Sequence, residues 1–179
     1  IEAAVFYNGS TVAFTVANSE SATSSGIELE VRKRVVQNLM MVFNASWIGS
    51  NVVVSGLSDY SRYLQGQSPY LVNAGLFYSE PESGIQANVL YNIVGKRIYV
   101  IGDNVLSSNV FEMSRNVLDA NISKTFGKVE VKAGAQDILN QPFKLIQDTN
   151  RDNKITDTDG VFQEFRRGSN FYVSVNYKF

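Results

Sequence analysis

The last nine residues of the chain, FYVSVNYKF (171–179), decide the fold class. Large apolar residues occupy every second position, namely Phe171, Val173, Val175, Tyr177 and Phe179. The positions between them carry Tyr172, Ser174, Asn176 and Lys178. Successive side chains of a β-strand point to opposite faces, whereas a helix repeats every three to four residues. The stretch therefore predicts a strand with one apolar and one wet face.

The same period of two returns along the chain, for example in GIELEVRKR (26–34) and KVEVKAGAQ (128–136). No stretch shows the period of an amphipathic helix. The pattern predicts nine strands, at residues 1–8, 11–18, 24–34, 40–53, 69–79, 84–95, 114–126, 128–139 and 168–179.

Long and short connections alternate from the fourth predicted strand onward. The long ones are residues 54–68, 96–113 and 140–167, and the short ones are 79–83 and 126–128. Short turns at one end and long loops at the other are typical of outer-membrane β-barrels. In lipid, every backbone N–H and C=O group must pair within the protein, which a closed sheet achieves. We therefore predict an all-β fold, an antiparallel transmembrane β-barrel.

Two other folds give alternating strands: a soluble β-barrel or sandwich that acts as a binding module, and a complete eight-stranded outer-membrane barrel with a structural or adhesion role. Strands of 11 to 13 residues with such unequal loops are rare in soluble domains. The aromatic residues also gather near strand ends, where the two membrane interfaces would place them. These residues are Tyr70, Phe77, Tyr78, Phe126, Phe171, Tyr177 and Phe179.

The composition excludes several functions. The chain has 16 Lys+Arg against 17 Asp+Glu, which argues against a nucleic-acid binder. It has no His and no Cys, which excludes acid–base catalysis by histidine, catalysis by a cysteine thiolate, and zinc sites built from these two residues. The longest apolar runs are five residues, far short of the roughly 20 that a membrane helix needs. We expect no enzymatic activity.

The number of predicted strands indicates whether residues 1–179 can form a closed barrel by themselves. A closed single-chain barrel has an even number of strands and both termini on the side of the short turns. With Phe179 on the periplasmic side, the first of nine strands begins on the outer side. We therefore expect residues 1–179 to be the C-terminal part of one larger barrel domain.

Four segments carry a family resemblance: YLQGQSPYLVNAGLFY (63–78), GIQANVLYNIVGKRIYVIG (84–102), EMSRNVLDANISKTFGKVEVKAGAQDILNQP (112–142) and RRGSNFYVSVNYKF (166–179). In this order they resemble the C-terminal end of TonB-dependent receptors of the Bacteroidetes type. The resemblance implies a plugged barrel of about 22 strands in the outer membrane of a Gram-negative bacterium. It also implies uptake of a scarce nutrient, driven by TonB through an N-terminal plug that residues 1–179 lack, and a surface lipoprotein as a potential partner.

The alternating C-terminal residues Phe171, Val173, Val175, Tyr177 and Phe179 also resemble the signal that the outer-membrane barrel assembly machinery reads. A strand with a free edge can add to an exposed edge of that machinery. Phe179 can serve in addition as a residue of the interfacial girdle.

The segment DTNRDNKITDTDG (148–160) has the spacing of a calcium loop. The predicted ligands are Asp148, Asn150, Asp152, the backbone carbonyl of Lys154, and Asp159. Asn153 stands where such loops carry Gly, and Asp159 where they carry a longer Glu. The alternative is a solvated acidic loop without metal.

Two further groups concern the transport path. The charged residues Glu28, Glu30, Arg32, Glu130, Lys132 and Lys178 fall on the wet face and are expected to solvate the lumen. Tyr60, Arg62 and Tyr63 fall in a long loop that can contact a solute. Nothing in the sequence specifies that solute.

Overall fold

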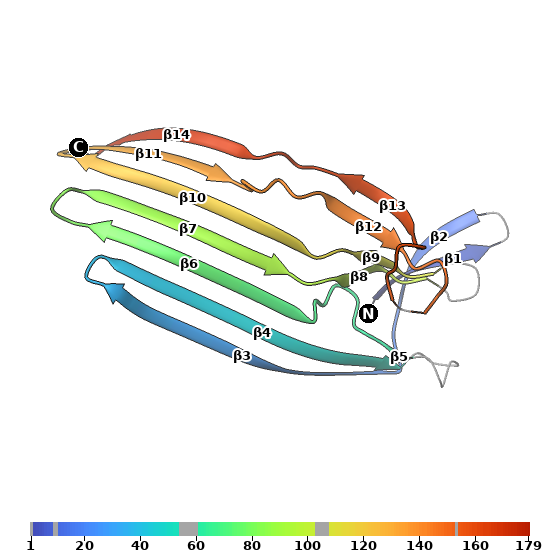
Figure 1. Ribbon diagram of the computed structural model, residues 1–179. Coiled ribbons are helices and arrows are strands. Elements are labelled where there is room, and N and C mark those ends of the chain that lie inside the picture. The colour runs from blue at the N-terminus through green and yellow to red at the C-terminus, as the bar shows by residue number, and fades with distance from the viewer. Residues whose placement is uncertain (1, 9–10, 54–60, 103–107, 153) are drawn as a thin grey trace.

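The computed structural model describes residues 2–8, 11–53, 61–102, 108–152 and 154–179. The regular elements in these ranges are antiparallel strands (Figure 1). They are β1 (Glu2–Asn8), β2 (Thr11–Ala17), β3 (Ser21–Val36), β4 (Leu39–Val53), β5 (Ser61–Arg62), β6 (Tyr70–Glu80), β7 (Ile85–Val94), β8 (Arg97–Val100), β9 (Val110–Glu112), β10 (Arg115–Phe126), β11 (Val129–Gln136), β12 (Phe143–Gln147), β13 (Gly160–Phe165) and β14 (Asn170–Tyr177). Across the same ranges, no helix has the length and apolar character needed to span a membrane.

Seven strands form one long sheet in the order β14-β11-β10-β7-β6-β4-β3, and the short β5 pairs with the end of β4. The turns 37–38, 81–84 and 127–128 all lie at one end of this sheet, as does the C-terminus (Figure 1). Gly127 has φ of +58°, a conformation that glycine adopts without strain in a two-residue hairpin turn. We call this end the short-turn end.

Four of the long strands continue into a second sheet at the opposite end. Its order, β13-β12-β9-β8, repeats the order β14-β11-β10-β7 of the strands that it extends. Short breaks separate the two sheets, so each hairpin bends on its way out (Figure 1). We call this second sheet the distal sheet.

The structure confirms the nine predicted strands as strands and corrects their arrangement. β1 and β2 pair with each other in a sheet of their own, so seven strands rather than nine build the long sheet. The segments 54–68, 96–113 and 140–167, predicted to be loops, contain β5, β8, β9, β12 and β13. These strands run for only two to six residues. Alternation over so few residues cannot be distinguished from a loop by period alone.

The buried apolar residues lie at the distal end. Among the described residues, the buried apolar ones are Val52, Ile98, Ile101, Val110, Phe111, Leu145 and Ile146. The accessible surface of the chain is 11,625 Å², whereas a compact monomer of 19.9 kDa would expose about 8,700 Å². The long sheet is therefore a wall without a core of its own.

The long sheet is also open. Among the described strands, β3 pairs only with β4 and β14 only with β11, so the two edges of the sheet do not meet. A complete small barrel formed by this chain alone, one of the alternatives above, is therefore not what the structure shows.

Candidate functional site

One side of the long sheet, called the apolar face below, carries almost only apolar side chains. The strand register places Val173 opposite Ala133, and Ala133 opposite Ile122, on this side. Its larger members are Ile27, Leu29, Val31, Met41, Phe43, Trp47, Tyr70, Val72, Leu76, Tyr78, Ile85, Val89, Tyr91, Ile93, Leu118, Ile122, Phe126, Val129, Val131, Phe171, Val173, Val175 and Tyr177.

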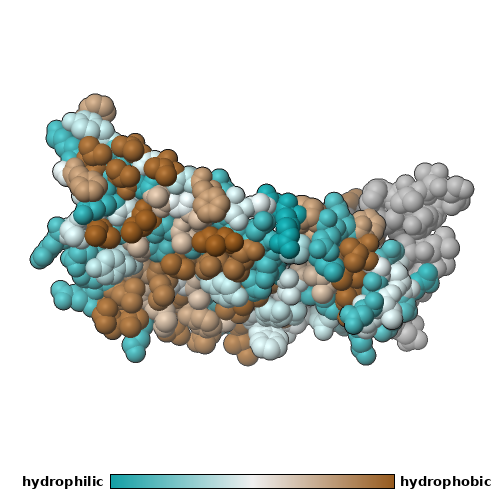
Figure 2. Space-filling view, turned by 45° about the horizontal axis from the view of Figure 1, so that its top comes forward, coloured by the Kyte–Doolittle hydropathy of each residue, from teal (hydrophilic) through white to brown (hydrophobic). Residues whose placement is uncertain are grey.

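The side chains of the apolar face are uncovered. Val173 is 73% exposed, Val175 66% and Ile122 54%. Figure 2 shows hydrophobic residues gathered over the half of the molecule that the long strands occupy. Soluble monomers rarely expose a continuous apolar patch larger than a few hundred Å². A closed, water-soluble core around these residues is therefore not present in the described structure.

The opposite side, called the polar face below, carries amides, hydroxyls and charges. Asn88 and Asn121 exchange hydrogen bonds of 3.1 and 2.7 Å across β7 and β10, and the side-chain amide of Asn92 donates to Asn73 across β6 and β7. Asn88, Asn92 and Asn121 stand on the wet side of the predicted strands, but their pairing into an amide ladder depends on the register between strands, which the sequence alone does not specify. The predicted lumen residues Glu28, Glu30, Arg32, Glu130 and Lys132 also lie on this face.

The polar face holds a half-buried ion pair where β10 begins. The Arg115 guanidinium donates to the Asp137 carboxylate at 2.9 Å. Asp119 lies on the same face, and its carboxylate accepts the backbone N–H of Asp137 at 2.8 Å. These contacts fix the bend at which β11 leaves the long sheet.

Charged side chains interrupt the apolar face only near its short-turn edge. Glu80 pairs in register with Ile85, and Ile85 with Lys124, whose ammonium lies 5.0 Å from the centre of the Phe126 ring. An aliphatic stem along apolar surface with its charge at the edge is typical of a lysine at a membrane interface. The row formed by Glu80, Ile85 and Lys124 therefore marks the short-turn edge of the apolar face.

The predicted aromatic girdle is corrected at one position. Tyr78, Phe126 and Tyr177 lie on the apolar face near the short-turn end. Phe77 lies on the polar face, where its ring covers Gly75. Phe77 and Tyr78 are neighbours in a strand, so they cannot share a face.

The C-terminal strand β14, which carries the predicted assembly signal, is an edge strand of the long sheet. One edge pairs with β11 from Gln136 to Val129, and the other edge has no partner among the described strands. Four of its alternating apolar residues are exposed on the apolar face, and Phe179, two residues past the end of the strand, is fully exposed. The assembly role itself stays a prediction.

The segment from Asp148 to Asp159 closes on itself through side-chain to backbone hydrogen bonds. The Asp148 carboxylate accepts the backbone N–H of Asp152 at 3.2 Å, and Asp152 accepts that of Lys154 at 2.8 Å. Asp159 accepts the N–H of Thr156 at 2.7 Å, which lowers the pKa of that carboxyl. Asn150 also accepts the N–H of Asp152, at 3.2 Å.

These contacts bear on the predicted calcium site. In the described residues, no three acidic side chains gather into a group that could hold a metal ion. The predicted ligand set also uses the Asn150 amide and the Lys154 carbonyl, so calcium in this loop stays a prediction. Asn153, the position that departs from the usual Gly, lies outside the described residues.

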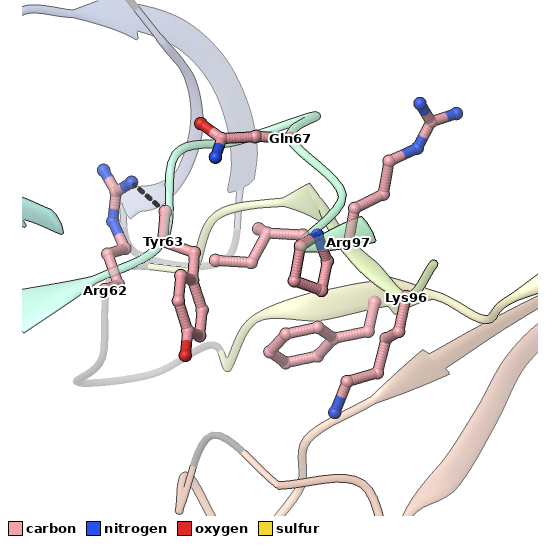
Figure 3. Close-up of a pocket in the computed structure, with 8 residues that line it drawn as sticks. Arg62, Tyr63, Gln67, Lys96 and Arg97 are labelled. Atoms are coloured by element: carbon pink, nitrogen blue, oxygen red, sulfur yellow. Dashed lines mark hydrogen bonds between the residues drawn. The ribbon is translucent and has the colours of Figure 1, made fainter. Parts of the chain in front are cut away.

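A cavity of about 340 Å³ lies beside the distal sheet, between the segment 62–69 and the β8–β9 hairpin (Figure 3). Arg62 and Tyr63, predicted to contact a solute, line it together with Lys96 and Arg97. Tyr60, predicted alongside them, lies outside the described residues. The sequence does not reveal that Ile98 and Phe111 complete this cavity, because the pattern predicts a single loop over residues 96–113, where the structure has β8 and β9.

Comparison with known proteins gives one informative match. The chain is similar in structure to the ferric yersiniabactin uptake receptor FyuA from Yersinia pestis, with a TM-score of 0.64 and 15% sequence identity. The match covers 92% of this chain and 25% of the receptor chain, so this chain spans about a quarter of that protein. No family model matches the sequence, and no curated protein matches it. The similarity confirms the predicted fold class, an all-β antiparallel sheet of the transmembrane-barrel type.

Proposed function

We propose that this chain forms part of the wall of a TonB-dependent outer-membrane transporter that takes up a scarce nutrient. The apolar face lies against lipid, the polar face lines the lumen, and the distal sheet projects outside the cell. The short-turn end and the C-terminus then lie on the periplasmic side.

The observation that carries this proposal is the exposed apolar face on one side of a long sheet whose other side is polar. Hydrocarbon stabilises such a face, because moving each large apolar side chain out of water is favourable by roughly 1.5–3 kcal/mol of free energy. The amide ladder and the charged side chains of the polar face would stay hydrated in a water-filled lumen. The open edges of β3 and β14 fit a wall that other strands complete.

The structural similarity to FyuA supports a role in uptake rather than catalysis, and the sequence resemblance supports dependence on TonB. Such transporters have about 22 strands in all, so the plug and the strands that this chain does not supply belong to the rest of the proposed transporter. The Bacteroidetes subtype and a surface lipoprotein partner rest on the sequence resemblance alone.

Two measurements on the full-length protein in a Gram-negative host test this function. We expect the protein to remain in the outer-membrane fraction after washing with urea and to dissolve only in detergent. We also expect deletion of its gene and deletion of tonB to abolish growth on the same scarce nutrient. A protein released by urea, or a growth defect independent of TonB, would contradict the proposal.

We further propose that calcium orders the segment 148–159. Trypsin can cut this loop after Arg151 and Lys154, so its cleavage rate reports on order. We expect millimolar calcium to slow cleavage, since extracellular calcium sites bind at about 0.1–1 mM. Asp152→Ala removes a ligand and abolishes this protection, whereas Asp157→Ala, in the same loop but outside the predicted ligand set, preserves it. Cleavage at equal rates with calcium and with EGTA would show that the loop binds none.

A further inference from the structure

The cavity beside the distal sheet has fixed walls. The backbone N–H of Gly66 donates to the carbonyl of Ile98 at 2.9 Å, and the Ser68 hydroxyl donates to the carbonyl of Gly95 at 2.8 Å. These bonds hold the segment 62–69 against the edge of β8. Ile98 and Phe111, which are 2% and 4% exposed, anchor the opposite wall. Hydrogen bonds therefore hold the two backbone segments that border the cavity.

The register relates this cavity to the polar face of the long sheet. Val94 pairs with Arg115 on that face, and Ile98 pairs with Phe111 four residues further out on each strand. The pairing keeps the same register across the break between the two sheets, and on this basis we place Ile98 and Phe111 at the outward continuation of the polar face. In the proposed transporter, the cavity thus lies where the lumen opens at its outer end.

Three of the cavity's lining residues are cationic, but two are engaged elsewhere. Arg97 pairs with the Glu112 carboxylate at 2.7 Å. Arg62 is buried and donates to the backbone carbonyl of Tyr63 at 3.3 Å. In Figure 3 both guanidinium groups point away from the side on which the Lys96 ammonium and the Tyr63 hydroxyl lie.

Lys96 is the cation that remains for a ligand. Its ammonium lies 5.0 Å from the centre of the Phe111 ring, and no carboxylate of the described residues forms an ion pair with it. The interior of the cavity is lined by Tyr63, Phe111, Pro69 and Ile98. The chemistry is therefore a partly aromatic slot with one ammonium and one phenol hydroxyl on one side and the Gln67 amide on the other (Figure 3).

We propose that this cavity binds an aromatic carboxylate, either free or as one group of a larger solute. A planar ring fits against the exposed side chain of Tyr63 and against Pro69, while the carboxylate meets Lys96 and the Tyr63 hydroxyl. A volume of about 340 Å³ is near the lower limit of ligand pockets, so it takes a ring system of one or two rings. The proposal rests on the proposed function in one respect, that this site is open to solutes from outside the cell.

The test is binding of 2-naphthoate, with its neutral analogue 2-naphthamide, to the full-length protein in detergent by isothermal titration calorimetry. We expect naphthoate to bind at least about tenfold more tightly than naphthamide, as one charge-assisted hydrogen bond implies. Lys96→Met keeps the aliphatic stem over Phe111 and removes the charge, so it abolishes this difference. Lys144→Met, which removes a charge elsewhere in the distal sheet, leaves it unchanged.

Tyr63→Leu supplies a second variant, because Tyr63 is largely exposed and its loss leaves the buried wall intact. We expect it to weaken both probes. The proposal is overturned if naphthoate and naphthamide bind equally, or if Lys96→Met and Tyr63→Leu both bind naphthoate like the unmodified protein. Urea-washed membranes from the same variants report separately on the transporter proposal, so failure of one is distinguishable from failure of the other.

Discussion

A lysine placed on the apolar face tests which solvent bathes it. Val173 points outward from the middle of β14 and is 73% exposed, so a lysine there meets no protein atom that it must displace. In water such a substitution changes the free energy of unfolding by less than about 0.5 kcal/mol. In the middle of a bilayer it costs about 2–4 kcal/mol, because the ammonium must leave water.

Two further lysine substitutions on the same strand make the test internally controlled. Asn176→Lys lies on the polar face opposite Glu130, which accepts a hydrogen bond from Asn176 at 3.3 Å, so its cost is expected to be near zero. Val175→Lys lies one row closer to the short-turn edge, in register with Val131 and Lys124, and costs about 0–1 kcal/mol.

The assay is urea unfolding of the full-length protein in lipid vesicles, followed by the loss of heat-modifiable mobility on gels. The expected order of destabilisation is Val173→Lys, then Val175→Lys, then Asn176→Lys. If Val173→Lys costs no more than Asn176→Lys, the apolar face does not lie in hydrocarbon.

Three further predictions concern other parts of the chain. At Gly134 an added Cβ would lie 2.5 Å from the Tyr172 ring, so Gly134→Ala is expected to cost about 1–3 kcal/mol in the same unfolding assay; an unchanged midpoint contradicts the packing. The backbone N–H of Thr156 donates to Asp159 and holds the pKa of that carboxyl below its ordinary value of 3.8. The hydrogen bond therefore stabilises the loop above pH 3.8 and is lost as the pH falls through the lowered pKa. Hydrogen exchange of the Thr156 amide should accelerate, relative to its intrinsic rate, as the pH falls through that range, and a protection factor independent of pH would contradict this prediction. Deleting Phe179 should reduce the amount of protein in the outer membrane several-fold, and normal assembly of the shortened chain would rule out its role as a signal.

Much of the fold was predictable because its pattern is local. The strand Arg115–Phe126, for example, alternates strictly from Leu118 to Ser123 and places Phe126 on the same side as Leu118, which is long enough to indicate a period of two. The exposure of Val173 and Ile122 follows from the same alternation once lipid is assumed. The turn 37–38 was less evident, because β3 extends to Val36, beyond the end of the predicted strand.

The distal sheet and its cavity were not predictable in this way. β8 and β9 are three to four residues long, and their pairing depends on the long hairpin that brings them together. Arg62 and Tyr63, a basic and an aromatic residue in one predicted loop, were predictable as residues that contact a solute. Their partner wall, Ile98 and Phe111, lies more than thirty residues further along the chain and is brought to them only by the tertiary fold.

The most direct test of the central claim is a nitroxide scan of residues 170–177, one position at a time, in the full-length protein in lipid vesicles without other cysteines. Collisions with oxygen, which dissolves in lipid, and with a water-soluble nickel complex are measured at each position. We expect alternation with a period of two, with oxygen dominant at Phe171, Val173 and Val175 and nickel dominant at Tyr172 and Ser174. Equal accessibility on both faces, or nickel dominant at Val173, would contradict it.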